Sequence, residues 1–334
     1  MNLNGITGHE VQLNRLEAML RGGFMPQALI FHGLGGTGKR KIAMRLLMSM
    51  FCRKEQIKPC LTCNDCNLIE NNTHPDVLML LPNEKGNISI GAESEYGSVR
   101  WLISRLAKKS ISGRYGVIID GIENLSFDGQ NALLKTIEEP PENTLIIMIA
   151  ENKRMILPTI LSRATEIYFG KLSSSDILDI LKKQNVYDKS FDRAVALSGG
   201  SAEIAFFLTN EDNMRELEII VSGVVDFIKN KGIINIDLDP LQKKIGARAL
   251  VRILVCVFRA MLLSELRGEP YLFSKETYMG TENIINLIKL IKILLALEKG
   301  LKVNMLLNVS FKGLLYSIDE FPDTGLPEFE DAAF

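Results

Sequence analysis

The segment QALIFHGLGGTGKRKIAMRLLMSMF, residues 27–51, decides the fold. It begins with the short apolar run 27–33, which is typical of a buried strand, and it ends with 39–51, where apolar residues recur at the period of an amphipathic helix. The turn between them has the spacing of a phosphate-binding loop, with Gly33, four residues, Gly38 and Lys39. Because such a loop requires a strand before it and a helix after it, the segment predicts the first unit of a phosphate-binding α/β fold.

This loop departs from the ATPase pattern at its next residue. Arg40 follows Lys39, where an ATPase carries a serine or threonine whose hydroxyl ligates Mg²⁺, and a guanidinium cannot ligate a metal. Asp120, within the run 115–123, closes a buried strand as a metal-binding aspartate would, but Gly121 stands where many ATPases carry a water-polarising glutamate. Whether this site binds or hydrolyses nucleotide therefore stays open. The degenerate phosphate site consists of Gly33, Gly38, Lys39 and Asp120.

Two further apolar runs predict the rest of a sheet. The stretches 115–123 and 144–152 are continuously apolar, as in strands that are buried on both faces of a parallel sheet. Between them, residues 131–139 read as a helix that Pro140 and Pro141 stop. A strand, a crossover helix and a strand at this spacing favour a doubly wound parallel sheet.

The second half of the chain reads as helical. Residues 173–184 begin with helix-capping serines, and 190–208 read as two short helices joined at Gly199-Gly200. The polar stretches 170–176 and 209–213 suggest domain boundaries. The predicted fold is α/β plus all-α, with an α/β domain at 1–170, a small helical domain at 171–209 and a larger helical domain at 210–334.

Composition restricts the class of protein. A chain of 334 residues is long enough for two or three domains, and 46% hydrophobic with 24% charged residues is ordinary for a soluble protein. The net charge of −1 does not indicate a nucleic-acid-binding surface. Residues 1–22 lack the pattern of a secretory signal, and the apolar stretches 251–266 and 284–297 are interrupted by arginine or lysine. We expect a cytoplasmic protein without a membrane span.

Four cysteines between positions 52 and 66 predict a metal site. Thiolates at this density suit tetrahedral Zn²⁺, and a cytoplasmic setting argues against disulfides. An Fe–S cluster would use the same ligands, and incidental cysteines are the plainer alternative. The surrounding sequence offers no general base, so we expect a structural zinc module at about 52–66. The ligands are Cys52, Cys60, Cys63 and Cys66, whereas Cys256 reads as a core thiol.

Other candidate residues leave alternatives open. The histidines His9, His32 and His74 are far apart, and we interpret them as structural. A specialised role for His74, in the turn-rich stretch 72–76, stays open as the alternative. In LPTILSRA, residues 157–164, Arg163 is either a surface charge or an arginine finger that reaches a neighbour's phosphate.

The apolar surface of residues 282–307 is wide, which indicates burial on most sides. It reads as the interior of a helical domain, and we favour an added subunit contact, since one small bundle can hardly cover this helix and 251–266 as well.

Together these stretches resemble the clamp-loader branch of the AAA+ proteins, as found in bacterial DNA polymerase III. The resemblance covers roughly residues 5–208. The matching stretches are QALIFHGLGGTGK, the four-cysteine insert, NTHPD, GVIID, LPTILSR and, most specific of all, NALLKTIEEPPENT. The resemblance implies an AAA+ sheet domain with a zinc insert, a helical lid, and a collar that joins the subunits. It also implies a hetero-pentamer with gamma/tau and delta subunits, which uses ATP to load a sliding clamp onto primed DNA.

Four positions distinguish a motor subunit of that family from a silent one. A motor subunit has a hydroxyl after the loop lysine, an acid after the strand-end aspartate, a polar residue at the end of the next strand and an arginine in the lid helix. Here these positions hold Arg40, Gly121, Ala150 and Glu203. Because each change removes a different contact to the reacting phosphate, we expect a non-hydrolysing structural subunit.

Arg163 is retained from the family's Ser-Arg-Cys motif, although the cysteine is Ala164 here. In the family this arginine reaches into the neighbouring motor subunit, so the resemblance implies a finger that acts in trans. One alternative is a divergent, ATP-hydrolysing gamma/tau-type subunit. Another is a stand-alone nucleic-acid-binding module, which would need interleaved aromatic and basic residues.

Overall fold

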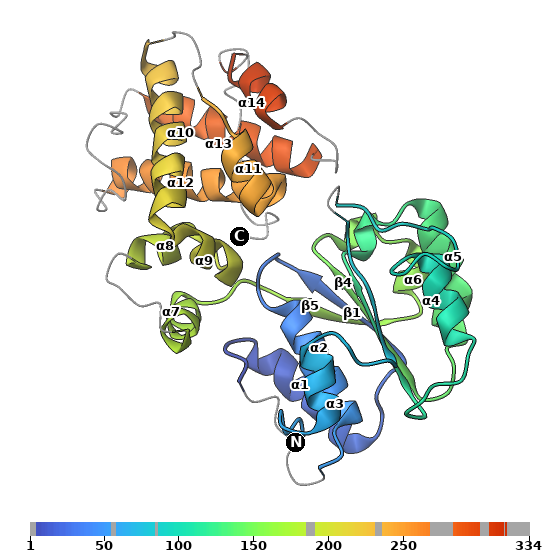
Figure 1. The fold of residues 1–334 in the computed structure, drawn as a ribbon. Helices are drawn as coiled ribbons and strands as arrows, with labels where there is room; N and C mark the ends of the chain where they lie inside the picture. The colour runs from blue at the N-terminus through green and yellow to red at the C-terminus, as the bar shows by residue number, and fades with distance from the viewer. Residues whose placement is uncertain are drawn as a thin grey trace. The chain divides into compact units, whose positions relative to one another are not determined.

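The computed structural model describes residues 5–54, 58–83, 86–184, 191–230, 236–267, 283–300, 307–316 and 318 (Figure 1). The chain divides into two compact units, Met1–Gly170 and Lys171–Phe334, and the division falls inside the polar stretch 170–176. A further division near residue 209 stays a prediction. The acidic tail after residue 320 lies outside the described residues.

The first unit contains a parallel sheet of five strands in the order β2-β3-β4-β1-β5. This confirms the predicted doubly wound α/β fold. The edge strands β2 and β5 were not predicted, because they are short or partly exposed and lack a continuous apolar run. The strands are β1 (Ala28–Gly33), β2 (Val77–Leu80), β3 (Tyr115–Asp120), β4 (Thr144–Ala150) and β5 (Thr165–Phe169).

Helices cover both faces of this sheet (Figure 1). Leu29 and Phe31 of β1 pack in one apolar layer with α1 and α2, whereas Ile30 points into the opposite layer with α4 and α5. This alternation follows from the period of two residues in a strand. The helices of the unit are α1 (Glu10–Gly22), α2 (Lys39–Phe51), α3 (Asn64–Glu70), α4 (Val99–Leu106), α5 (Phe127–Glu138) and α6 (Pro158–Leu161), with 3-10 turns η1 (Ile122–Asn124) and η2 (Lys153–Met155).

The second unit, in its described residues, is built from helices alone, as predicted. The hinge between α8 and α9 requires glycine, because Gly199 and Gly200 have positive φ and a Cβ at Gly200 would lie 2.3 Å from the Lys171 side chain. The helices are α7 (Ser174–Lys183), α8 (Phe191–Leu197), α9 (Ala202–Leu208), α10 (Glu211–Asn230), α11 (Asp239–Ile245), α12 (Ala247–Arg267), α13 (Ile284–Gly300) and α14 (Leu307–Tyr316).

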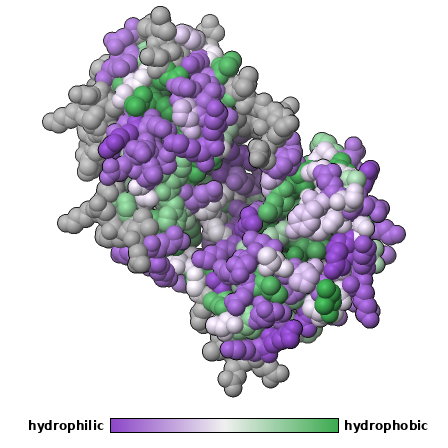
Figure 2. Space-filling model, in the orientation of Figure 1, coloured by the Kyte–Doolittle hydropathy of each residue, from purple (hydrophilic) through white to green (hydrophobic). Residues whose placement is uncertain are grey.

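The apolar helices α12 and α13 are covered within their own unit. Phe258 of α12 and Leu290 and Leu294 of α13 are fully buried in one cluster shared with α10 and α14. The argument that one bundle can hardly cover both helices is therefore wrong, and a subunit contact there stays a prediction. None of the described helices combines the length and apolar character that crossing a bilayer requires. Figure 2 shows a largely hydrophilic surface with scattered apolar residues.

Candidate functional site: a degenerate phosphate loop, a cysteine cluster and a held arginine

The phosphate loop joins β1 to α2 through glycines that the geometry requires. Gly33 has φ +127°, and a Cβ there would lie 2.1 Å from the carbonyl oxygen of Phe169 on the neighbouring strand. Gly38 has φ +92° and caps the start of α2. Both conformations are ones that residues with a side chain avoid. The structure therefore has a strand, a glycine-bearing turn and a helix at the positions where the sequence predicts the loop.

Lys39 is buried and points back into this loop. Its Nζ donates hydrogen bonds to the carbonyl oxygens of Gly33, at 2.8 Å, and Leu34, at 2.5 Å. The loop is also supported from outside, since Nε2 of His9 lies 3.1 Å from the Thr37 carbonyl oxygen. The lysine and the histidine therefore hold the loop in place by contacts within the chain.

The metal-binding half of the site is replaced by an arginine. Nη1 of Arg40 lies 3.8 Å from Oδ2 of Asp120 at the end of β3. Burial raises the pKa of Asp120, while the positive charges of Arg40 and Lys39 act in the opposite direction. The guanidinium stands against the carboxylate that Mg²⁺ would contact, and it offers no ligand atom. These residues do not fit a magnesium ion.

The two positions that would activate and sense an attacking water are closed as well. Gly121 has φ +82°, and a Cβ there would lie 2.5 Å from Nδ2 of Asn124, so a glutamate would be strained at this position. Ala150 is buried at the end of β4. Glu123 is buried too, and it accepts a hydrogen bond at 2.6 Å from the backbone N–H of Glu151. Glu203, the fourth altered position, lies in the first turn of α9 in the second unit.

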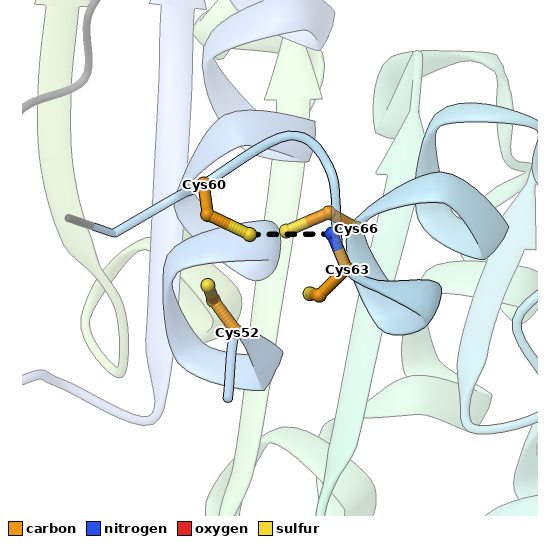
Figure 3. A group of neighbouring side chains, drawn as sticks. All are labelled: Cys52, Cys60, Cys63 and Cys66. Atoms are coloured by element: carbon orange, nitrogen blue, oxygen red, sulfur yellow. Dashed lines mark hydrogen bonds between the residues drawn. The ribbon is translucent and has the colours of Figure 1, made fainter. Parts of the chain in front are cut away.

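The four cysteines predicted as ligands do come together (Figure 3). Cys52 follows α2, Cys60 lies in the connecting loop, Cys63 caps α3 and Cys66 lies within α3. Their sulfur atoms all lie within 4.8 Å of one another. A tetrahedral zinc ion with Zn–S bonds of about 2.3 Å places its sulfurs about 3.8 Å apart. The cluster therefore fits a metal ion such as zinc.

The thiols of the cluster differ in how readily they lose a proton. The backbone N–H of Thr62 lowers the pKa of Cys60 to about 5, and the N–H of Cys63 donates to the Cys60 sulfur at 3.3 Å. Burial raises the pKa of the Cys66 thiol. A bound divalent ion would stabilise all four thiolates together, which burial alone disfavours.

His74 anchors the cysteine insert to the sheet. Its Nε2 lies 3.8 Å from Oδ1 of Asp65, its Nδ1 accepts from the backbone N–H of Asp76 at 3.2 Å, and its ring packs edge-on against Phe51. Asp65 in turn accepts from Nε of Arg53 at 2.7 Å. Burial lowers the pKa of His74, which favours its neutral form. These contacts agree with the structural role interpreted from the sequence.

Arg163 follows α6 and is held by its own chain. Its Nε lies 2.6 Å from Oε1 of Glu138, the last residue of α5. Its Nη1 donates to the carbonyl oxygen of Thr159 at 2.9 Å and to Oγ of Ser162 at 3.1 Å. The Arg163 side chain is 39% exposed and that of Glu138 is 42% exposed. The arginine is thus at the surface and folded back toward α5.

Gln130 supports the segment that leads to Arg163, and the sequence analysis missed it. The side chain is 1% exposed. Its Nε2 donates to the carbonyl oxygens of Leu125 and Met155, and its Oε1 accepts from the N–H of Leu157 at 2.8 Å. A signal was available, because Gln130 is spaced from buried Leu133 and Ile137 as one face of a helix.

We expect Gln130→Ala to lower the free energy of unfolding by about 2–3 kcal/mol, because the N–H of Leu157 and two carbonyl groups lose a buried partner. The matched control is Asn131→Ala, an exposed position on the same helix, where we expect a change within about 0.5 kcal/mol. Urea unfolding of the full chain measures both. Equal effects at the two positions would contradict the assignment.

Comparison with known proteins gives a consistent result. Residues 8–173 match the model of the family described as "DNA polymerase III, delta subunit". The DNA polymerase III subunit delta' of Bacillus subtilis is 30% identical over 163 residues, which cover 48% of this chain and 47% of that protein. Subunit delta' of Pseudomonas aeruginosa is 28% identical over 210 residues, covering 61% and 62%. The chain thus spans roughly half the length of the curated relatives it matches.

A solved structure also aligns along most of the chain. The DNA polymerase III gamma subunit-related protein of Thermotoga maritima covers 91% of this chain and 98% of its own, with 18% identity and a TM-score of 0.41. The family match covers the part of the chain that holds the sheet, the degenerate loop and the cysteine cluster. Because the family model matches residues 8–173, the sheet-bearing first unit of this chain belongs to the DNA polymerase III delta subunit family.

Proposed function

We propose that this protein is the delta' subunit of a bacterial DNA polymerase III clamp loader. It does not hydrolyse ATP itself and serves as a structural member of a cytoplasmic hetero-pentamer with gamma/tau and delta subunits. The complex would place a sliding clamp on primed DNA, and Arg163 would complete the ATP site of a neighbouring subunit. The curated relatives named delta' and the loss of magnesium and water contacts at the phosphate loop support this proposal.

The position of Arg163 carries the proposal. Strands β1 and β5 are parallel neighbours, and the phosphate loop follows the carboxyl end of β1, whereas Arg163 precedes the amino end of β5. The five residues of β5, at about 3.3 Å each, put roughly 15 Å between these two edges of the sheet. An exposed arginine at the opposite end of the strands from its own loop supports a role at the phosphate of another subunit rather than at its own.

Arg163, the Arg40–Asp120 pair and the cysteine cluster would each have a different role. The Arg163 guanidinium would stabilise the negative charge that develops on the transferred phosphoryl group in the neighbouring subunit. Beside the protein's own loop, Arg40 pairs with Asp120, the carboxylate that a metal would contact. Cys52, Cys60, Cys63 and Cys66 would hold a Zn²⁺ ion. Four thiolates fill a tetrahedral site, so such an ion would stabilise the insert and would not bind substrate.

A divergent, ATP-hydrolysing gamma/tau-type subunit is the second candidate. The relative named subunit tau in Escherichia coli favours it, at 29% identity over 174 residues, which cover 52% of this chain and 26% of that protein. The two candidates differ in the turnover of the isolated chain.

We expect the isolated full chain to show no magnesium-dependent ATP hydrolysis above the buffer rate. Arg40→Thr is expected to stay silent too, because Gly121 and Ala150 still leave the attacking water without a base or a sensor. The measurement is phosphate release with Mg²⁺ and again with EDTA. The same chain mixed with gamma/tau and delta subunits should elute as one complex that does hydrolyse ATP. Clear turnover by the isolated chain would favour the second candidate.

A further inference from the structure

We propose that Glu138 restrains Arg163, so that the arginine is available to the neighbouring ATP site only when a phosphate competes with this carboxylate. The inference rests on the proposed role of Arg163 in trans, and it adds a second residue that sets how readily the arginine acts. Glu138 is a positioning residue in this scheme. It touches the guanidinium and not the nucleotide.

The restraint consists of three contacts on one guanidinium. Glu138 binds Nε at 2.6 Å, while the Thr159 carbonyl and the Ser162 hydroxyl oxygens accept from Nη1. A phosphate is bound best through two parallel N–H donors of the guanidinium. The two possible pairs are Nε with Nη2 and Nη1 with Nη2, and one donor of each pair, Nε or Nη1, is already engaged. The bonds to Glu138 or to the end of α6 must therefore exchange before Arg163 can grip a phosphate in this way.

The main chain at Arg163 is held by hydrogen bonds that do not involve its side chain, since the N–H groups of Ser162 and Arg163 donate to the carbonyl oxygens of Pro158 and Ile160. Gln130, near the start of α5, binds Met155 and Leu157 through buried hydrogen bonds. Glu138 is the last residue of the same helix, eight residues and about 12 Å farther along. Gln130 thus bonds the segment to α5 at Met155 and Leu157, and the ion pair with Glu138, which must open, is the bond at Arg163. Rotation of the arginine side chain is the movement that requires the fewest of these bonds to break.

The strength of the restraint follows from its exposure. Both side chains of the ion pair are about two-fifths exposed, and pairs of this kind are weak. A triphosphate carries several negative charges and competes well with one carboxylate for the same cation. The pair therefore lowers the fraction of Arg163 that is ready to act without blocking the reaction.

The test is ATP turnover by the clamp loader reconstituted with gamma/tau and delta subunits. We expect Glu138→Gln to raise kcat/KM about two- to fivefold, the range that the weakness of exposed ion pairs allows. The matched control is Glu139→Gln, which removes the same charge from the next, exposed residue and should leave kcat/KM at the wild-type value. In an Arg163→Ala background, Glu138→Gln should have no effect, because its action passes through the arginine.

Each outcome separates this inference from the proposed function. If Arg163→Ala leaves turnover unchanged, the proposed trans role fails and the restraint fails with it. If Arg163→Ala lowers turnover but Glu138→Gln matches wild type, lowers kcat/KM, or raises it equally without Arg163, only the restraint is overturned. A thermal unfolding midpoint within about 2 °C of wild type shows that Glu138→Gln acts without loss of folding.

Discussion

Arg163→Ala is expected to lower ATP turnover at the neighbouring site of the assembled clamp loader by about a thousandfold, the lower end of what an arginine finger contributes. The physical reason is the loss of a fixed positive charge beside the phosphoryl group as it gains negative charge. The assay is steady-state hydrolysis by the reconstituted complex in the presence of clamp and primed DNA. Turnover at sites that this chain does not adjoin should persist.

Arg154→Ala is the control for this experiment. Arg154 lies in the same exposed segment between β4 and β5, so the variant removes an equal charge at nearly the same place in the chain. We expect wild-type turnover from it. Because Arg163 is exposed, its removal should also leave the far-UV circular dichroism and the elution volume of the complex unchanged. Hydrolysis at the wild-type rate by an intact Arg163→Ala complex would contradict the proposed role.

Cys63→Ser is expected to remove one equivalent of bound zinc and to destabilise the first unit. Cys63 supplies a ligand from the N-cap position of α3, and Cys66 of the same helix supplies another, so the loss of Cys63 opens the metal site where α3 begins. A loss of at least ~3 kcal/mol corresponds to a fall in Tm of roughly 6–12 °C for a unit of this size. Metal analysis of protein purified without chelator, together with thermal unfolding, measures both effects.

Cys256→Ala is the control for Cys63→Ser, because it removes a thiol that is not a predicted zinc ligand. Cys256 belongs to the second unit, where burial raises the pKa of its thiol to about 11, and it lies outside the four-cysteine cluster. This variant should keep its zinc even if the second unit is destabilised. A wild-type protein that contains no zinc, or a Cys63→Ser variant that retains it in full, would show that the cluster is not the metal site.

Sequence patterns formed by neighbouring residues predicted elements that the structure contains. The helix predicted at 39–51 is α2 with the same bounds, and the Gly199-Gly200 joint separates α8 from α9. Each of these features depends on residues that are close in sequence, such as an apolar period or a glycine with positive φ. The sheet edges were harder to predict, because β2 has four residues and β5 alternates between buried and exposed positions.

The sequence by itself determined the strand-loop-helix unit, the four cysteines available to a metal, and the replacement of a magnesium ligand by Arg40. These are properties of residue type and local spacing, which do not depend on distant parts of the chain. Only the tertiary structure decided that the backbone at Gly121 has a positive φ, that the four sulfurs converge, and that Glu138 and Gln130 of α5 hold the segment of Arg163. Such contacts join residues up to 27 positions apart, and their geometry exists only once the sheet and its helices have packed.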